Sequence, residues 1–112
     1  MKAHSVYKVV TYVPEKCFEE FSSSLLSTTF NTIGKYTNCM SWSSVTSTWT
    51  PSEGANPFIG TIGEKSVEKE VRLEIRCTDE EIKNLLSLIR ENHPYEEAEI
   101  DVFPMLTDDM FL

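Results

Sequence analysis

The chain has 112 residues and a formal net charge of −8, and its length is typical of one domain, residues 1–112. The excess of carboxylates repels phosphate backbones and anionic lipid surfaces, so it disfavours nucleic acid and membrane as partners. A cationic partner, a metal ion or a neutral ligand stays open. The sequence shows no apolar run of membrane-spanning length and no signal-peptide core, which predicts a cytoplasmic location.

The first half of the chain predicts a strand, a helix and a second strand. Residues 6–13 (VYKVVTYV) are apolar on both faces, as in a central strand. Residues 14–27 begin with proline and glutamate and then place apolar side chains at helical spacing, which predicts a helix. Residues 36–49 are typical of an extended strand, and a change in their alternation predicts a β-bulge near residues 43–44.

The second half predicts a loop, a strand, a helix and a last strand. Residues 51–63 carry two prolines and three glycines, so they form a loop. From Val71 to Cys77, odd positions are apolar and even positions are charged, which predicts a strand with one buried face. Thr78 with Glu81 forms a capping box for a helix that Pro94 stops. Residues 100–104 outline an edge strand.

This order of elements predicts an α+β fold, a ferredoxin-like βαββαβ sandwich. Two helices would cover one face of a four-stranded antiparallel sheet. The second face would carry charged side chains and an exposed aromatic residue, Trp42 or Trp49. Sheets of this kind commonly cover that face with other subunits, so we expect a homo-oligomer, with a closed ring of three favoured.

Four segments of the chain carry a family resemblance: residues 33–42 (IGKYTNCMSW), 53–60 (EGANPFIG), 68–75 (EKEVRLEI) and 93–104 (HPYEEAEIDVFP). They resemble the domain inserted in many bacterial Nif-three-like proteins, the family with a dinuclear metal centre. Such inserted domains are similar in fold to the PII signalling proteins and the CutA divalent-cation tolerance proteins, so the resemblance implies a PII/CutA-like trimer. The metal centre of that family belongs to flanking domains and is assigned to no residue of this chain.

The loop Glu53–Gly60 supplies one set of candidate ligand-binding or interface residues. Its glycines permit unusual backbone angles, its asparagine offers donors and acceptors, and its phenylalanine can stack on a ligand. The alternative is a rigid loop between subunits, anchored by Phe58 in a neighbouring copy. The relatives tend to have glycines shortly before this loop where residues 44–51 read SVTSTWTP, which departs from the family pattern. The candidates are Glu53, Asn56, Pro57, Phe58 and Gly60.

The turn His93-Pro94-Tyr95-Glu96-Glu97 supplies the second set. An imidazole beside carboxylates can bind a divalent cation, so His93 is a candidate metal ligand, with Tyr95 and Glu96 as ligand-binding or interface residues. The structural alternative has Tyr95 filling the edge of the core and His93 capping the last carbonyls of the helix. His4, near the N-terminus, is a poor ligand candidate.

No catalytic residue is assigned, because the sequence lacks a Ser-His-Asp order, an HExxH motif and a CxxC motif. Cys17, Cys39 and Cys77 are expected as reduced thiols. We therefore predict a non-catalytic oligomeric module that binds a small-molecule ligand, a cation or a partner protein at subunit clefts. No cofactor is identified beyond a possible divalent cation. Two alternatives stay open: a purely structural interaction module, and an accessory subunit of a metal-dependent hydrolase core carried on another chain.

Overall fold

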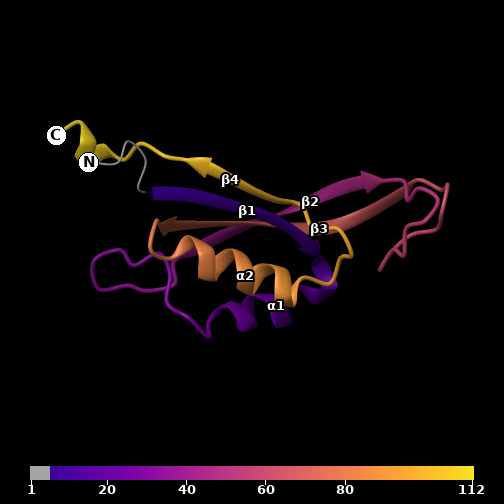
Figure 1. The fold of residues 1–112 in the computed structure, drawn as a ribbon, viewed down its shortest axis with the longest axis horizontal. Helices are drawn as coiled ribbons and strands as arrows, with labels where there is room; N and C mark the ends of the chain where they lie inside the picture. Colours follow the sequence, from indigo (N-terminus) through magenta and orange to yellow (C-terminus); the bar gives the residue numbers. More distant parts are fainter. Residues whose placement is uncertain (1–5) are drawn as a thin grey trace.

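The computed structural model describes residues 6–112 and has the predicted ferredoxin-like fold (Figure 1). Four antiparallel strands form one sheet in the order β2-β3-β1-β4, and both α-helices lie on the same side of it. The predicted central position of the first strand is confirmed. The elements are β1 (Val6–Pro14), η1 (Glu15–Cys17), α1 (Phe18–Leu25), β2 (Met40–Trp49), β3 (Ser66–Thr78), α2 (Ile82–Asn92), β4 (Ile100–Pro104) and η2 (Asp108–Met110).

The core lies between the sheet and the two helices. The predicted alternation of β3 is confirmed, because its odd positions from Val71 to Cys77 are buried against the helices. The apolar stripes of α1 and α2 complete the core, together with a phenylalanine from the segment after α1. The buried cluster comprises Val9, Val13, Phe21, Leu25, Phe30, Val71, Leu73, Ile75, Cys77, Leu85 and Ile89.

The first helix is shorter than the predicted 14–27. Pro14 has φ −55° and ψ 137°, so it ends β1 in an extended conformation, and a 3-10 turn precedes α1. At the other end, the hydroxyls of Ser22 and Ser24 donate to the carbonyls of Glu19 and Phe21, three residues earlier. Such local bonds compete with the helical ladder, which explains why the helix ends at Leu25.

The second strand has no β-bulge, so that prediction was wrong. Strand β2 begins at Met40 rather than Tyr36, and it pairs with β3 in one unbroken register as far as Trp49. The change in alternation has a different cause. Trp42 packs against Phe18 of α1 on the helix side, whereas Trp49, an odd number of positions later, packs against Tyr95 on the other side.

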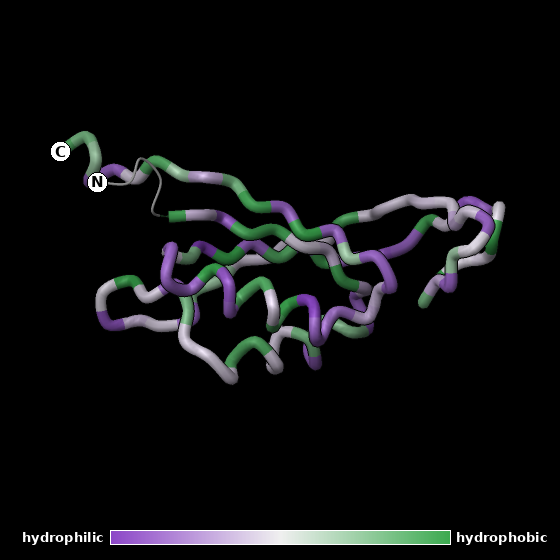
Figure 2. The backbone as a smooth tube through the Cα atoms, in the orientation of Figure 1, coloured by the Kyte–Doolittle hydropathy of each residue, from purple (hydrophilic) through white to green (hydrophobic). Residues whose placement is uncertain are grey.

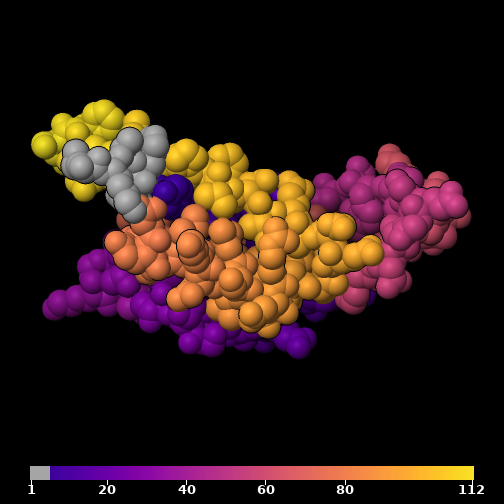
Figure 3. Space-filling view, viewed as in Figure 1, coloured from indigo at the N-terminus to yellow at the C-terminus, as the bar shows by residue number. Residues whose placement is uncertain are grey.

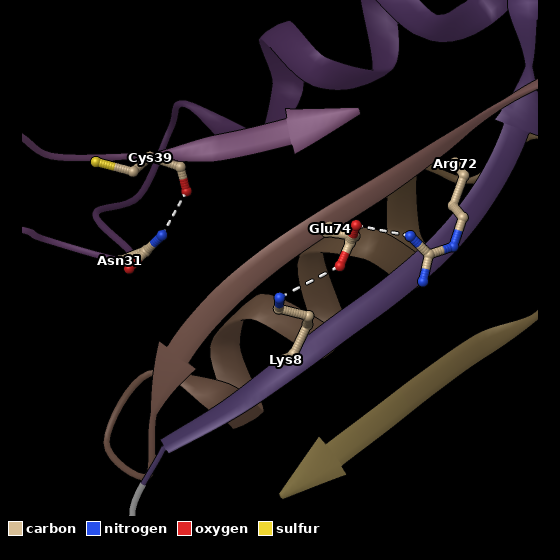
Figure 4. Close-up of polar contacts among 5 residues, drawn as sticks. All are labelled: Lys8, Asn31, Cys39, Arg72 and Glu74. Carbon is tan, nitrogen blue, oxygen red and sulfur yellow. Dashed lines mark hydrogen bonds and ion pairs between the residues drawn. The ribbon is translucent and has the colours of Figure 1, made fainter. Parts of the chain in front are cut away.

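Two asparagines fix the segment between α1 and β2. Asn31 and Asn38 have φ of 42° and 54°, a left-handed conformation that asparagine tolerates better than most residues. The Asn31 side chain donates to the carbonyl of Cys39 over 2.7 Å (Figure 4), and the Asn38 side chain donates to the carbonyl of Thr28. The backbone carbonyl of Cys39 therefore helps to fix the entry to β2.

The molecule is elongated, with extents of 51 × 26 × 22 Å. The β2–β3 hairpin extends past the helices, and its connecting loop lies at the opposite end from the C-terminus (Figures 1 and 3). The end of α2 is as predicted, because the helix stops at Asn92 and His93 is extended. Within residues 6–112, no helix combines the length and apolar character needed to cross a membrane.

The core predicts the effect of shortening Leu85, which is fully buried on α2. We expect Leu85→Ala to lower the free energy of unfolding by about 3 kcal/mol through lost burial and the cavity left behind. Leu26, which is exposed just after α1, is the matched control, and Leu26→Ala should change it by less than about 0.5 kcal/mol. Urea denaturation measures both values, and equal losses would contradict this account of the core.

Candidate functional site

A cavity of about 750 Å³ lies where the β2–β3 loop meets the segment between α2 and β4. Its sheet wall includes Glu70 and Arg72, which alternate along β3 with the core residues and so face away from the helices. Besides Ser, Thr, aliphatic and proline residues and Arg72, the lining includes four aromatic rings and four carboxylates. The rings are Tyr12, Trp49, Phe58 and Tyr95, and the carboxylates are Glu70, Glu96, Glu97 and Glu99.

The two predicted motifs meet at this cavity within one chain. The backbone N–H of Asn56 donates to the Glu96 carboxylate over 2.9 Å. The rings of Phe58 and Tyr95 lie 6.3 Å apart between centroids, edge to face. Residues 40 positions apart in the sequence therefore build a common wall, and the loop and the turn form one site before any second subunit is considered.

Gly60 allows the loop to fold back onto β2. Its φ is +116°, a conformation that residues with a side chain rarely adopt. A Cβ atom at this position would lie 2.8 Å from the Ser66 hydroxyl oxygen and 3.2 Å from the Pro51 ring. This close approach allows the Trp49 indole N–H to donate to the Ile59 carbonyl over 3.2 Å. Gly60 thus does not line the cavity, but it permits the backbone conformation of the loop that does.

Phe58 is held from two sides while remaining half exposed. Tyr95 contacts its edge from the cavity side, and the ammonium group of Lys16 lies 5.5 Å from its ring centroid. Lys16 belongs to η1 and lines a neighbouring surface hollow rather than this cavity. The phenyl ring of Phe58 therefore forms part of the cavity wall and also interacts with the Lys16 ammonium group, which does not line the cavity.

The Glu70 carboxylate is the most deeply placed charged group of the site, with 4% of the residue exposed. It accepts a hydrogen bond from the Tyr95 hydroxyl over 2.5 Å. Burial, followed by this bond to a carboxylate, raises the pKa of Tyr95 above its ordinary value, so the hydroxyl stays protonated and acts as a donor. The contact attaches the turn after α2 to the outer face of β3.

Arg72, the positively charged residue of the lining, pairs with a carboxylate that does not line the cavity. The Arg72 guanidinium lies 2.6 Å from the Glu74 carboxylate, which also lies 3.4 Å from the ammonium of Lys8 (Figure 4). The hydrogen bond from Arg72 holds the pKa of Glu74 below its ordinary value. At the other edge of the cavity, burial and the neighbouring Asp101 raise the pKa of Glu99. The residues that line the cavity therefore carry a net negative charge.

His93 supports the fold rather than presenting a free nitrogen. Its Nε2–H donates to the Tyr12 carbonyl over 2.8 Å, and its Nδ1 accepts from the backbone N–H of Tyr95 over 3.2 Å. Burial, as the largest cause, lowers the pKa of His93, which favours the neutral ring that this pattern requires. The structural alternative placed His93 on the last carbonyls of the helix, and this was wrong, because the carbonyl that His93 contacts belongs to β1.

The structure separates the predicted site residues into two groups. Pro57, Phe58, Tyr95 and Glu96 line the cavity, whereas Glu53, Asn56, Gly60 and His93 are not among its lining residues. Asn56 takes part only through the backbone contact with Glu96. Across residues 6–112, no group of three or more metal-ligating side chains comes together, and His4 lies outside the described residues.

Sequence reasoning missed half of the site, namely the contribution of the sheet. Glu70 and Arg72 stood on the predicted wet face of their strand, but nothing in the pattern distinguishes a buried carboxylate from an exposed one. Tyr12 was treated as part of a central strand, and Trp49 as an aromatic residue of an interface. The fragment EKEVRLEI, which contains Glu70 and Arg72 and carries part of the resemblance, is the one signal that could have singled them out.

Comparison with known proteins supports the family resemblance. The CutA1 divalent ion tolerance protein family matches residues 61–110. A protein of Halalkalibacterium halodurans named GTP cyclohydrolase 1 type 2 homolog is 32% identical over 104 residues, which cover 93% of this chain and 28% of that protein. A Bacillus cereus protein related to NIF3 superposes with a TM-score of 0.78 at 30% identity, covering 96% of this chain and 27% of that chain.

The fold alone is shared with a wider group. The PII-like protein CutA from Nostoc has a TM-score of 0.64 at 22% identity, covering 95% of this chain and 85% of that one. The predicted resemblance to the PII/CutA-like domain of NIF3-related proteins is confirmed. The chain spans about a quarter of the length of the NIF3-related relatives that it matches.

The environment of His93 predicts a pH dependence of stability. Because its pKa in the folded chain lies below the ordinary 6.5, the contribution of the neutral ring is complete above pH 6.5 and declines as the pH falls. We expect the free energy of unfolding to fall below that pH by at most about 1.4 kcal/mol per pH unit from this group. In His93→Gln, this part of the slope should disappear. The free energy of unfolding of both proteins is measured by urea denaturation at several pH values between 8 and 5. If it depends on pH in the same way in both proteins, the assignment to His93 is contradicted.

Proposed function

We propose that this domain is a non-catalytic, oligomeric module that binds a small ligand in the cavity between the 51–63 loop and the His93–Glu97 turn. The observation that carries the proposal is the cavity itself. Its volume of about 750 Å³ is within the range typical of small-molecule sites. Aromatic walls with a few placed polar groups, such as Glu70 and Glu96, are likewise typical of ligand pockets.

The state of three reactive side chains, one in the cavity wall and two outside it, supports binding over catalysis. Tyr95 holds its proton more tightly than an ordinary phenol, and both nitrogens of His93 are already engaged. Burial raises the pKa of the Cys77 thiol to about 11, which disfavours the reactive thiolate. Tyr95, His93 and Cys77 are therefore held in unreactive forms.

Exposed apolar side chains support an oligomer, and we propose a ring of three. The C-terminal segment has green, hydrophobic parts interrupted by purple, hydrophilic ones in Figure 2, and its large apolar side chains are exposed. These residues lie at the end of the molecule away from the cavity, so a contact between unlike ends of successive copies could close a ring. They are Phe103, Leu106, Met110, Phe111 and Leu112.

The relatives suggest a setting for such a module. The chain matches about a quarter of a GTP cyclohydrolase 1 type 2 homolog. We propose a regulatory or accessory role toward a core of that kind. A purely structural role is the competing proposal, and it requires the cavity to bind nothing.

A thermal-shift screen of metabolites tests ligand binding. We expect at least one compound to raise the melting temperature in a concentration-dependent manner, because a ligand that binds only the folded state stabilises it. Phe58→Ala should weaken the response by about tenfold in ligand concentration. Ile62→Ala is the matched control, since Ile62 is an exposed apolar residue of the same loop that does not line the cavity. If no compound changes the melting temperature, the structural alternative is favoured.

Light scattering tests the assembly. We expect the mass of three chains rather than that of one 12.8 kDa chain at micromolar concentration. Replacing Phe111, whose side chain is 74% exposed, with Ser should shift the mass toward one chain if the C-terminal segment mediates the contact. Leu26→Ser, at an exposed leucine beside α1, is the control that should leave the mass unchanged. A monomer in the unmodified protein would contradict the proposal.

A further inference from the structure

We infer that the cavity binds an organic cation, an alkylammonium or guanidinium group, with Glu70 as its counter-ion and the aromatic rings as its walls. This inference rests on the proposed function and names the chemical class of its ligand. Three properties of the cavity support it: uncompensated negative charge, aromatic walls, and a carboxylate arrangement unsuited to a bare metal ion.

The first property is charge without a matching cation. Glu70 is 4% exposed, yet its hydrogen-bond partner is the neutral hydroxyl of Tyr95. Within residues 6–112, no lysine, arginine or histidine nitrogen forms an ion pair with it, because Arg72 is engaged by Glu74. Removing a carboxylate from water without a positive partner is unfavourable, so a cation entering the cavity would relieve that cost.

The remaining carboxylates add to this field. Glu96, Glu97 and Glu99 also line the cavity, and Arg72 is the lining residue of opposite sign. A phosphorylated or carboxylated ligand would therefore meet repulsion from several sides, whereas a cation would be attracted over the whole mouth of the cavity. Charge alone thus separates the candidate ligand classes.

The second property is the aromatic surround. Trp49 and Phe58 each pack edge to face with Tyr95, at centroid distances of 5.5 Å and 6.3 Å. Aromatic faces attract ammonium and guanidinium groups within about 6 Å, and tryptophan does so most strongly. The contact of Lys16 with Phe58 shows the same attraction within the chain itself. An organic cation would interact with the aromatic rings through cation–π contacts and with the carboxylates through its charge.

The third property distinguishes an organic cation from a metal ion. Hard divalent ions require several oxygen ligands converging within about 2.6 Å of one point. Among residues 6–112 no three carboxylate, histidine or cysteine side chains converge in this way, and Glu96 and Glu70 are each engaged by another group, Asn56 and Tyr95. A cavity of about 750 Å³ also greatly exceeds the size of an ion. A larger cation with apolar substituents matches both its volume and its walls.

The test uses three probes that share one apolar body and differ in charge: 2-phenylethylammonium, 2-phenylethanol and 3-phenylpropanoate. The chain has two tryptophans, so Trp42→Phe leaves Trp49 as the fluorescent reporter in the cavity. At constant ionic strength, we expect a saturable fluorescence change with the ammonium probe. The alcohol and the carboxylate should bind at least about tenfold more weakly, as expected for loss of a charge-assisted contact.

Substitutions in the same background locate the charge. Glu70→Gln keeps the shape and an acceptor for Tyr95, and it should weaken ammonium binding by at least about tenfold. Glu20→Gln, at an exposed position on α1, changes the net charge equally and should leave the affinity within about twofold. Glu99→Gln provides a second cavity variant should the first fold poorly. Circular dichroism confirms the fold of each.

The outcomes separate this inference from the proposed function. Equal affinity for the ammonium and the alcohol, or no saturable binding of the ammonium, would overturn the inference. So would a Glu70→Gln protein that binds the ammonium as well as its parent does. If compounds from the thermal-shift screen still bind through Phe58 in any of these cases, the proposed ligand-binding function stands and only the charge of the ligand is wrong. If none binds, both fail.

Discussion

The hydrogen bond between the Tyr95 hydroxyl and the Glu70 carboxylate is the contact on which the site depends. It connects the turn after α2 to the face of β3 that points away from the core. Trp49 and Phe58 both pack against the ring of Tyr95, so the course of the loop follows from where this tyrosine is held. The backbone of Tyr95 is fixed in turn by His93, which reaches β1.

A buried carboxylate in this place weakens the fold in isolation. A hydrophobic residue at position 70 would avoid the desolvation of the charge, and buried charges are often less stabilising than apolar groups of equal size. The long β2–β3 hairpin places the carboxylate outside the main core, where its cost does not disturb the packing of Leu73 or Leu85. The apolar core lies on one side of the sheet and the polar cavity on the other, so a polar group can be placed in the cavity without interrupting the core.

The sequence was sufficient for the fold because its signals were local and consistent. The alternation from Val71 to Cys77 and the break at Pro94 need only neighbouring residues to be interpreted. Trp42 and Trp49 were harder, since their partners Phe18 and Tyr95 are distant in the chain, and a regular strand was mistaken for a bulged one. The loop and turn residues of the site were found from motifs. The environment of Glu70 depends on residues distant in the chain, such as Tyr95, so no local sequence pattern predicts that Glu70 is buried.

Gly60 limits how the tip of the hairpin can vary. Any other L-residue there would have to hold φ near +116° while its Cβ pressed on Ser66 and Pro51. Since Pro51 and Ser66 flank the loop at its two ends, this glycine ties the return of the loop to both strands of the hairpin. A substitution there would therefore alter the backbone path, whereas side chains of residues 55–59 can change without altering it.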